Sequence, residues 1–489
     1  MLQQLDTADS VRREVAPRIT QKRKAEFGQF MTPSTVARFM ANMFPPSTLP
    51  TCRLLDAGAG VGALSCAFLD RWIAGGFGFE TVETTAYEID DALRGHLKQH
   101  LENYSQVKAN VIAGDYINLA TNGDKQSKDY THAILNPPYK KINSNSPHRL
   151  ALRSVGIETV NLYSAFVALA VSQAAPGGQI VAIIPRSFCN GPYYRPFRDF
   201  IVKHAAIRHM HLFASRNKAF KDDDVLQENV IIRLERGSQQ GPVTITTSTD
   251  DSFTDLVTHE YPFDQIVHPD DPERFIHIPT SPEKCVIELS STIRYTLTDL
   301  GIKVSTGPVV DFRLKEHLRD MPEEDTVPLI YPGHLSINGT VWPVAHLKKP
   351  NAILRNEATE KWLYPNGFYC VVRRFSSKEE KRRIAASVVE PTAFGEHSVL
   401  GFENHLNLFH DNKHGLPELL ARGLAVFLNS TAVDKSFRRF NGHTQVNATD
   451  LKMMKYPNRE MLIELGKWAK QHGKITQDMI DKQCGKLIA

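Results

Sequence analysis

The chain has 489 residues, 42% of them hydrophobic and 23% charged, which is an ordinary globular composition and enough length for about two or three domains. No apolar run is long enough to cross a membrane, and the polar N-terminus lacks the apolar core of a signal peptide, so we expect a soluble, cytoplasmic protein without a membrane partner. The six cysteines are scattered without zinc spacing, which argues against a metal site or a disulfide framework, and a net charge of +4 is too small to indicate nucleic-acid binding by itself.

The N-terminal part divides at the stretch Phe27-Gly-Gln-Phe-Met-Thr-Pro33. Residues 1–26 are polar and basic and predict a separate helical segment. After Pro33 the apolar residues recur at helical spacing, with Thr32 or Ser34 placed to cap the helix. The start of this helix is a candidate anion site, although an ordinary capped helix explains the same pattern.

A glycine-rich loop follows the first predicted strand. Asp56, Gly58, Gly60 and Gly62 stand at alternate positions between a strand that begins at Arg53 and a helix over about 63–73. Glycines so spaced let the backbone turn sharply and come close to a ligand at the end of the strand. The spacing differs from that of dinucleotide-binding folds, but an acid followed by glycines between strand and helix predicts a cofactor site.

The next two predicted strands also end in acids. Glu88 ends the strand Thr84–Asp90, where a carboxylate can accept both hydroxyls of a ribose, although an acid that caps the following helix is the alternative. Asp115 ends the strand Asn110–Asp115, where it would receive an adenine amino group. Together with the glycine loop, these acids predict a nucleoside site at one sheet edge.

The fourth strand ends in Asn136, Pro137, Pro138 and Tyr139. Each proline fixes φ and removes an N–H, so the turn presents carbonyl acceptors, an amide side chain and an aromatic ring. Two such acceptors can hold the hydrogens of a planar amine so that its nitrogen attacks, while Tyr139 stacks on a base that has left its helix. A plain β-turn after a buried strand is the alternative.

Strand ends of this kind alternate with helices, which predicts a doubly wound parallel α/β sheet. We expect residues 140–153, beginning with Lys140 and Lys141, to form a mobile loop that closes over substrate. Helices near 161–170 and 196–204, strands at 179–185 and 209–213, and a hairpin with Phe220 near its tip complete the domain. For Phe220 alone, packing in a core is the simpler explanation.

We place the end of the sheet domain at residue 238 and expect a mixed domain over 239–459 and a helical tail over 460–489. Basic segments gather in this second half, at 348–349, 373–374, 378–383 and 435–439. Each alone is typical of a solvated face, but together they favour contacts with phosphates. The segment 438–450 is rich in side chains that contact base edges, and its candidates are Arg438, Arg439, His443, Gln445 and Asn447.

In this order the motifs resemble those of the gamma arrangement of DNA adenine-N6 methyltransferases, over residues 27–235. The resemblance implies a Rossmann-like S-adenosylmethionine-dependent methyltransferase domain followed by a mixed α+β target-recognition domain. It implies that Phe220 meets a flipped adenine opposite Tyr139. The implied cofactor residues are Phe30, Thr32, Pro33, Asp56, Gly58, Gly60, Glu88, Asp115, Asn136 and Phe166.

The second half is similar to restriction-modification adenine methylases of the BsuBI and PstI kind in segments 305–313 and 442–450. This implies a site-specific modification enzyme that acts on double-stranded DNA, with Lys140 and Lys141 among its DNA contacts. Few residues precede the first motif, so we expect the cognate restriction endonuclease to be a separate protein.

Two other classes of function stay open. Asn-Pro-Pro-Tyr also serves methylation of RNA bases and of glutamine amides in proteins, where a planar nitrogen poses the same chemical problem. A non-catalytic DNA-binding subunit that keeps the fold is the other alternative, and measurable binding of the cofactor would argue against it.

Overall fold

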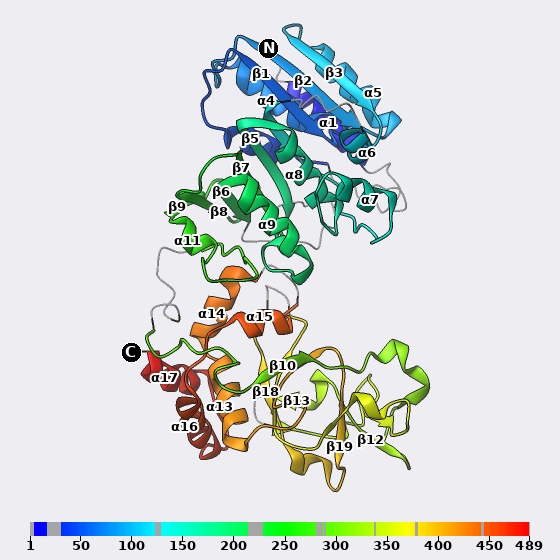
Figure 1. The fold of residues 1–489 in the computed structure, drawn as a ribbon, viewed down its shortest axis with the longest axis vertical. Coiled ribbons are helices and arrows are strands. Elements are labelled where there is room, and N and C mark those ends of the chain that lie inside the picture. The colour runs from blue at the N-terminus through cyan, green and yellow to red at the C-terminus, as the bar shows by residue number, and fades with distance from the viewer. Residues whose placement is uncertain are drawn as a thin grey trace. The chain divides into compact units, whose positions relative to one another are not determined.

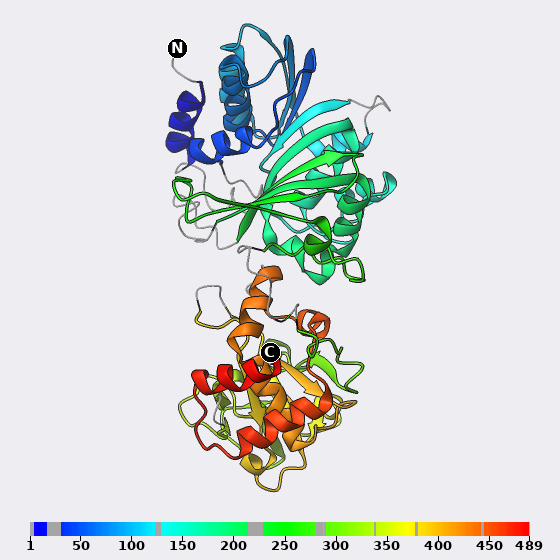
Figure 2. The same cartoon turned by 90° about the vertical axis from the view of Figure 1, so that its left-hand side faces the viewer.

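The computed structural model describes residues 4–16, 31–122, 129–213, 228–279, 287, 290–336, 339–376, 380–441 and 445–488. The chain forms two compact units, Met1–Pro282 (unit 1) and Glu283–Ala489 (unit 2), whose ribbons are drawn in Figures 1 and 2. Each unit has its own sheets and helices and is described by itself. Among the described helices, none combines the length and the apolar character that a membrane span requires.

Unit 1 is built on a nine-stranded sheet with the order β3-β2-β1-β4-β5-β7-β6-β8-β9 in the described part of the chain. The strands β1 to β5 pair in parallel, whereas β7 is antiparallel to both of its neighbours, β8 is parallel to β6, and β9 is antiparallel to β8. The predicted doubly wound parallel sheet is therefore confirmed for its first five strands. The strands are β1 Thr51–Ala57, β2 Thr81–Glu88, β3 Val107–Ala113, β4 Tyr130–Leu135, β5 Ala174–Pro185, β6 Ala205–Phe213, β7 Asn229–Arg236, β8 Val243–Ser248 and β9 Val257–Tyr261.

Helices cover both faces of this sheet (Figure 2). In β4, Ile134 packs into one core while Ala133 and Leu135 pack into the other, and all three are fully buried. Because helices cover both faces of such a parallel strand, its sequence is a continuous run of apolar residues. One face carries α1 Gln4–Val15, α3 Ser34–Asn42, α4 Ala63–Ile73 and α5 Asp91–Glu102, and the other α6 Tyr116–Asn122, α7 Pro147–Ser154, α8 Leu162–Gln173, α9 Arg195–His204 and α11 Phe263–Ile266.

The predicted boundaries of unit 1 were wrong at both ends. The N-terminal helix α1 is not a separate segment, because Leu5 and Ala8 are buried in the core and the Leu5 amide donates to Asp70 Oδ2 at 3.0 Å. The sheet does not end at residue 238, since β8 and β9 extend it and unit 1 runs to Pro282. The turn at residues 237–242 looks like a linker in sequence but only connects two strands of one sheet.

Unit 2 contains a four-stranded sheet with the order β10-β20-β17-β18, a five-stranded sheet with the order β11-β15-β12-β19-β16, and a two-stranded ribbon in its described part. It is a mixed α+β domain, as the sequence predicts. Its strands are β10 Lys303–Thr306, β11 Leu318–Arg319, β12 Thr326–Ile330, β13 Leu335–Ser336, β14 Gly339–Thr340, β15 Ala352–Leu354, β16 Leu363–Pro365, β17 Tyr369–Arg373, β18 Ala386–Val389, β19 Val399–Phe402 and β20 Leu406–His410.

The C-terminal helices belong to unit 2 and do not form a separate tail (Figure 1). A Cβ added at Gly423 would collide with the carbonyl oxygen of Leu462, and one at Gly466 with that of Leu419. The helix that contains Gly423 and the helix that contains Gly466 therefore cross with their backbones in contact, which only glycine permits at these positions. The helices are α13 Glu418–Leu428, α14 Thr431–Phe440, α15 Ala448–Met453, α16 Arg459–Lys470 and α17 Gln477–Ile488.

Candidate active site

A cavity of about 460 Å³ opens in unit 1 where the parallel strands β1 to β4 end. The carboxyl ends of parallel strands meet at one edge of the sheet, so motifs separated along the chain converge there. The lining includes eight of the predicted site residues, namely Thr32, Gly58, Gly60, Glu88, Asp115, Asn136, Pro138 and Phe166. Lys140 and Lys141 line it as well.

The glycine loop turns between β1 and α4 through left-handed backbone. Gly58, Gly60 and Gly62 have φ of 77°, 58° and 92°, a region that favours glycine. The amide of Gly58 donates to the Tyr87 carbonyl oxygen at 2.9 Å, which ties the loop to β2. A Cβ added at Gly60 would meet nothing within 4 Å, so the loop leaves open space on that side.

Glu88 connects this loop to the second strand. Its Oε2 accepts from the Gly60 amide at 2.7 Å and its Oε1 from the Asp90 amide at 2.8 Å. Burial raises the pKa of Glu88, and these backbone N–H groups oppose the rise. The helix-cap alternative for Glu88 was wrong, because Asp90 caps α5 by accepting from the amides of Ala92 and Leu93.

Asp56 differs from the prediction because it does not line the cavity. Its side chain is fully buried, and its Oδ2 accepts from the Ser65 hydroxyl at 2.6 Å and from the Ser65 amide at 3.2 Å. Burial raises the pKa of Asp56 to about 7, against these hydrogen bonds. Asp56 therefore anchors the start of α4 beneath the glycine loop and is not among the residues that line the cavity.

Asp115 is paired with a histidine that the sequence did not single out. His148, on α7, places its Nε2 3.0 Å from Asp115 Oδ2, and both residues line the cavity. Burial acts to raise the pKa of Asp115, but hydrogen bonds from His148 and the Asn118 amide outweigh it and leave the pKa below its ordinary value. The same bond raises the pKa of His148. Beside this pair, Tyr116 packs against Phe166 with ring centroids 5.0 Å apart.

The Asn136 side chain is held from both sides. Its Nδ2 donates to Thr32 Oγ1 at 2.9 Å, and its Oδ1 accepts from the Tyr139 hydroxyl at 3.3 Å. The prediction that Thr32 caps α3 was wrong, because Pro33 is the N-cap and no side chain caps that helix. The hydroxyl of Thr32 orients the amide of Asn136, and Thr32 also lines the cavity, where it was predicted to face a cofactor. Tyr139 lies edge-on to Tyr163, with ring centroids 6.1 Å apart.

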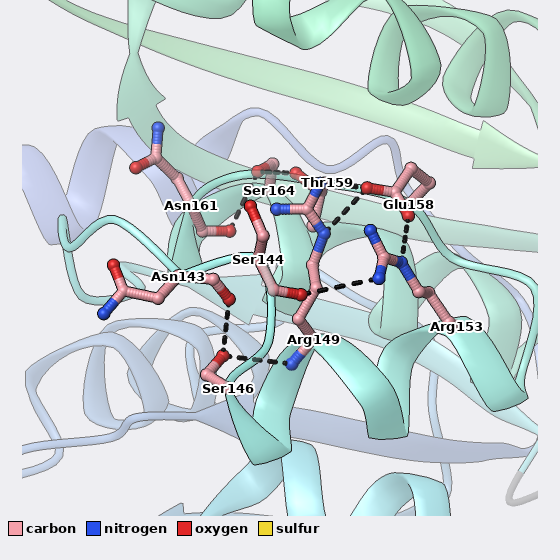
Figure 3. A network of polar contacts seen from close by, with 9 residues as sticks. All are labelled: Asn143, Ser144, Ser146, Arg149, Arg153, Glu158, Thr159, Asn161 and Ser164. Atoms are coloured by element: carbon pink, nitrogen blue, oxygen red, sulfur yellow. Dashed lines mark hydrogen bonds and ion pairs between the residues drawn. The ribbon is translucent and has the colours of Figure 1, made fainter.

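The segment after this motif is folded, contrary to the predicted mobile loop over 140–153 (Figure 3). It contains the helix α7 and is closed at its ends, where the Ile142 amide donates to the Val160 carbonyl oxygen and the Leu162 amide to the Lys140 carbonyl oxygen, both at 2.8 Å. Glu158 accepts from Arg149 Nε at 2.7 Å and from Arg153 Nε at 2.6 Å. These contacts fix α7 and hence His148 at the cavity.

The remaining predicted residues fall in three groups. Phe30, Phe220 and His443 lie outside the described residues. Pro33, Pro137 and Tyr139 are described but do not line the cavity, and Tyr139 reaches it only through its bond to Asn136. Arg438, Arg439, Gln445 and Asn447 belong to unit 2.

Sequence comparison agrees with this site. Residues 68–220 match the model of the Eco57I restriction-modification methylase family. The chain is 53% identical to the type II methyltransferase M.BsuBI of Bacillus subtilis, over 100% of this chain and 99% of that protein. It is 43% identical to the type II methyltransferase M.PstI of Providencia stuartii, over 97% of this chain and 95% of that protein. The chain belongs to the type II methyltransferases of restriction-modification systems.

The fold of this type II methyltransferase also occurs in a solved structure of a DrdV–DNA complex. The two superpose with a TM-score of 0.54 over 96% of this chain and 59% of that one, at 11% identity. At this identity the likeness concerns the fold alone.

Some of the residues predicted to contact DNA form hydrogen bonds or ion pairs within unit 2 of the type II methyltransferase. Arg438 Nε pairs with Asp434 Oδ2 at 2.7 Å, and Gln445 Oε1 accepts from Arg374 Nη2 at 3.3 Å. Asn447 caps α15 in a reciprocal pair with Asp450. Asn447 thus has a structural role that its position before an Ala-Thr-Asp sequence would have indicated.

Ile89, Tyr116 and His148 are among the cavity residues that the sequence did not single out. Ile89 lines the cavity and is 45% exposed, and its position directly after Glu88 was the available signal. Tyr116 follows Asp115 in the same way. His148 had no local signal, because its partner Asp115 lies on another element.

Proposed function

We propose that this type II methyltransferase transfers a methyl group from S-adenosylmethionine to N6 of an adenine in double-stranded DNA. The observation that carries the proposal is the position of Asn136 after the end of β4, on the cavity that the Gly60–Glu88 contact shapes, with the Tyr139 hydroxyl bonded to the Asn136 amide oxygen. The family membership supports methyl transfer. The order of the motifs, with the glycine loop before Asn-Pro-Pro-Tyr, supports adenine N6 as the acceptor.

The cavity residues fit the proposed methyl donor. The cavity volume of about 460 Å³ lies within the usual range of ligand pockets, roughly 300–1,000 Å³. Open space beside Gly60 admits the close approach of an amino acid or sugar, and the Glu88 carboxylate supplies acceptors for ribose hydroxyls. Asp115 offers an acceptor for an adenine amino group beside the Phe166 ring. When bound, S-adenosylmethionine supplies an activated methyl group on a positively charged sulfur.

Asn136 would hold the attacking amine. The bond from Asn136 Nδ2 to Thr32 orients the amide so that its oxygen faces the Tyr139 hydroxyl. In the substrate complex an amine hydrogen would take the place of that hydroxyl, and Tyr139 would stack on the base. Held this way, the lone pair of the adenine nitrogen would face the bound donor, which would supply the methyl group, and one amine proton would leave to water. Positioning of the two reactants then accounts for most of the rate enhancement.

The DNA substrate is supported by charge and by family. Lys140 and Lys141 are exposed at the cavity, directly after the Asn-Pro-Pro-Tyr motif, where a phosphate of a flipped nucleotide would come close. We further propose a separate restriction endonuclease of the same specificity as the biological partner of this enzyme. The same chemistry on RNA or on a glutamine amide would not require unit 2.

The test is Asn136→Ala, assayed by transfer of tritiated methyl groups to DNA from a host without modification. Removing the amide should lower kcat by about a hundredfold or more, because the amine loses its alignment. Affinity for S-adenosylmethionine, measured by calorimetry, should stay within about twofold. Asn103→Ala, an exposed change on the same unit, is the matched control and should keep full activity. Near-normal methylation of DNA adenine by the Asn136 variant, or methylation of RNA in place of DNA by the wild type, would contradict the proposal.

A further inference from the structure

Two segments of unit 2 that resemble modification methylases meet around one buried asparagine. Asn407, fully buried in β20, accepts from the Thr306 hydroxyl at 3.0 Å and donates from Nδ2 to the Val446 carbonyl oxygen at 2.7 Å. Thr306 belongs to the segment 305–313, and Val446 to the segment 442–450. The fold therefore brings both segments to the same end of the β17–β20 pair.

A group of planar side chains lies beside this junction. The rings of Phe375 and His405 are 4.7 Å apart, tilted by 41°, and Phe375 is 39% exposed. The Arg374 amide donates to the His405 carbonyl oxygen at 2.8 Å, and Arg374 Nη2 donates to Gln445 Oε1 at 3.3 Å. We call Arg374, Phe375, His405 and Gln445 the His405 patch.

A buried carboxylate orients the histidine of this patch. Glu403 is fully buried, and it contacts His405 twice, through Oε1 to the ring Nδ1 and through Oε2 to the backbone amide at 2.9 Å. Burying a carboxylate is costly unless it is paired. The contact directs Nδ1 inward, so the other ring nitrogen, Nε2, lies on the far side of a ring whose side chain is 38% exposed.

The surroundings of the patch are strongly basic. Segments 373–383 and 434–441 together contain nine lysines and arginines but only three acids, while the net charge of the whole chain is +4. The remainder of the chain is therefore slightly acidic. The two segments are joined by hydrogen bonds, from the Arg383 amide to Asp434 Oδ1 at 2.6 Å and from Arg438 Nη2 to the Glu380 carbonyl oxygen at 2.9 Å.

We propose that the His405 patch contacts the base edges of duplex DNA and that the two basic segments contact its phosphates. Arg, Gln and His are side chains that hydrogen-bond to base edges, and an exposed ring beside them packs on a base or sugar. Basic segments without such planar groups would give affinity for DNA but little sequence preference. The assignment rests on the proposed DNA substrate and states which surface of unit 2 recognises it.

The experiment compares Phe375→Ala and His405→Gln with the wild type in the full chain. The matched control is His472→Ala, which removes the ring from a second aromatic–histidine pair, tilted by 37° against Trp468 with ring centroids 4.9 Å apart, and whose ring Nδ1 contacts the Trp468 carbonyl oxygen in place of a carboxylate. We expect each patch variant to raise KM for DNA at least about fivefold and to change the base preference in a genome-wide map of methylated sites. The affinity for S-adenosylmethionine should be unchanged, because its proposed site lies in unit 1, and a thermal unfolding curve like that of the wild type shows that unit 2 of each variant folds.

The outcomes separate this inference from the proposed function. Patch variants with the wild-type KM and the wild-type map would overturn the patch while leaving adenine methylation intact. A wild-type protein that binds random duplex DNA by fluorescence anisotropy but methylates none would instead overturn the proposed function, and weaker binding by the variants would still support the patch. Should a variant fail to fold, photo-crosslinking of a 5-iodouracil duplex to the wild type decides: crosslinks at Phe375 or His405 support the patch, and crosslinks confined to other parts of unit 2 overturn it.

Discussion

Glu88→Gln tests the central contact of the proposed donor site. The carboxylate accepts from two backbone amides, Gly60 at 2.7 Å and Asp90 at 2.8 Å, and only 3% of the residue is exposed. A glutamine amide offers one acceptor oxygen and turns its NH2 group toward the second N–H. One backbone hydrogen bond is therefore lost.

The lost hydrogen bond sets the size of the expected effects on stability and on cofactor binding. A hydrogen bond to a charged acceptor contributes about 1.5–3 kcal/mol, so the free energy of unfolding should fall by about that amount. A ribose hydroxyl would lose a charged acceptor as well, which predicts a dissociation constant for S-adenosylmethionine about 10- to 150-fold higher. Because Glu88 is almost fully buried, screening by solvent reduces these values little.

Calorimetric titration with S-adenosylmethionine and thermal unfolding are the assays. Glu83→Gln is the matched control, since Glu83 lies on the same strand β2 but is only half-buried and pairs with Lys108. A donor analogue without the ribose 2′-hydroxyl should lose affinity for the wild type and little for Glu88→Gln. An unchanged dissociation constant in Glu88→Gln, together with wild-type sensitivity to the missing hydroxyl, would refute the assignment of Glu88 to the ribose.

Two further predictions concern stability. The raised pKa of His148 means that its pairing with Asp115 stabilises the fold fully below the unfolded pKa, about 6.5, and is lost as pH rises through the folded pKa. The lowered pKa of Asp115 means that its share is present above about 3.9 and is lost as pH falls through its folded pKa. From about pH 6 to about pH 9 the melting temperature of the wild type should therefore decline relative to that of His148→Ala, and parallel curves for the two proteins would contradict this pairing. Gly423→Ala should destabilise unit 2 by about 1–3 kcal/mol or more, because the new Cβ collides with the Leu462 carbonyl oxygen in a packed helix crossing. Gly485→Ala, whose new Cβ meets nothing within 4 Å in α17, should instead be neutral or stabilising, and equal melting temperatures for the two variants would argue against the close crossing.

Local sequence patterns correctly predicted where much of the site lies. The apolar strands β1 to β4 each end in a glycine, an acid or Asn-Pro-Pro-Tyr, and parallel strands necessarily bring such ends to one edge. Gly58, Gly60, Glu88, Asp115 and Asn136 are found together in the cavity for that reason, and Phe166 joins them from α8. The family resemblance needed nothing more than the order of these motifs.

Several of the corrections concern contacts between separate elements of the fold. The hydroxyl of Thr32 meets Asn136, which follows 104 residues later, and no periodicity indicates such a contact. Asp56 is an acid before a glycine loop in sequence, but the packing of α4 buries it against Ser65. The pairing of β8 with β6 moved the end of the sheet domain past residue 238.

Sequence by itself determined the order of strands and helices at this edge and the chemistry of their ends, because backbone periodicity and turn residues act locally. Only the tertiary structure decided which side chains contact the cavity, that α7 holds His148 against Asp115, and that Glu403 orients His405 in unit 2. These pairings depend on burial and on contacts between segments far apart in the chain. The local sequence around each residue does not show which distant residue it will contact.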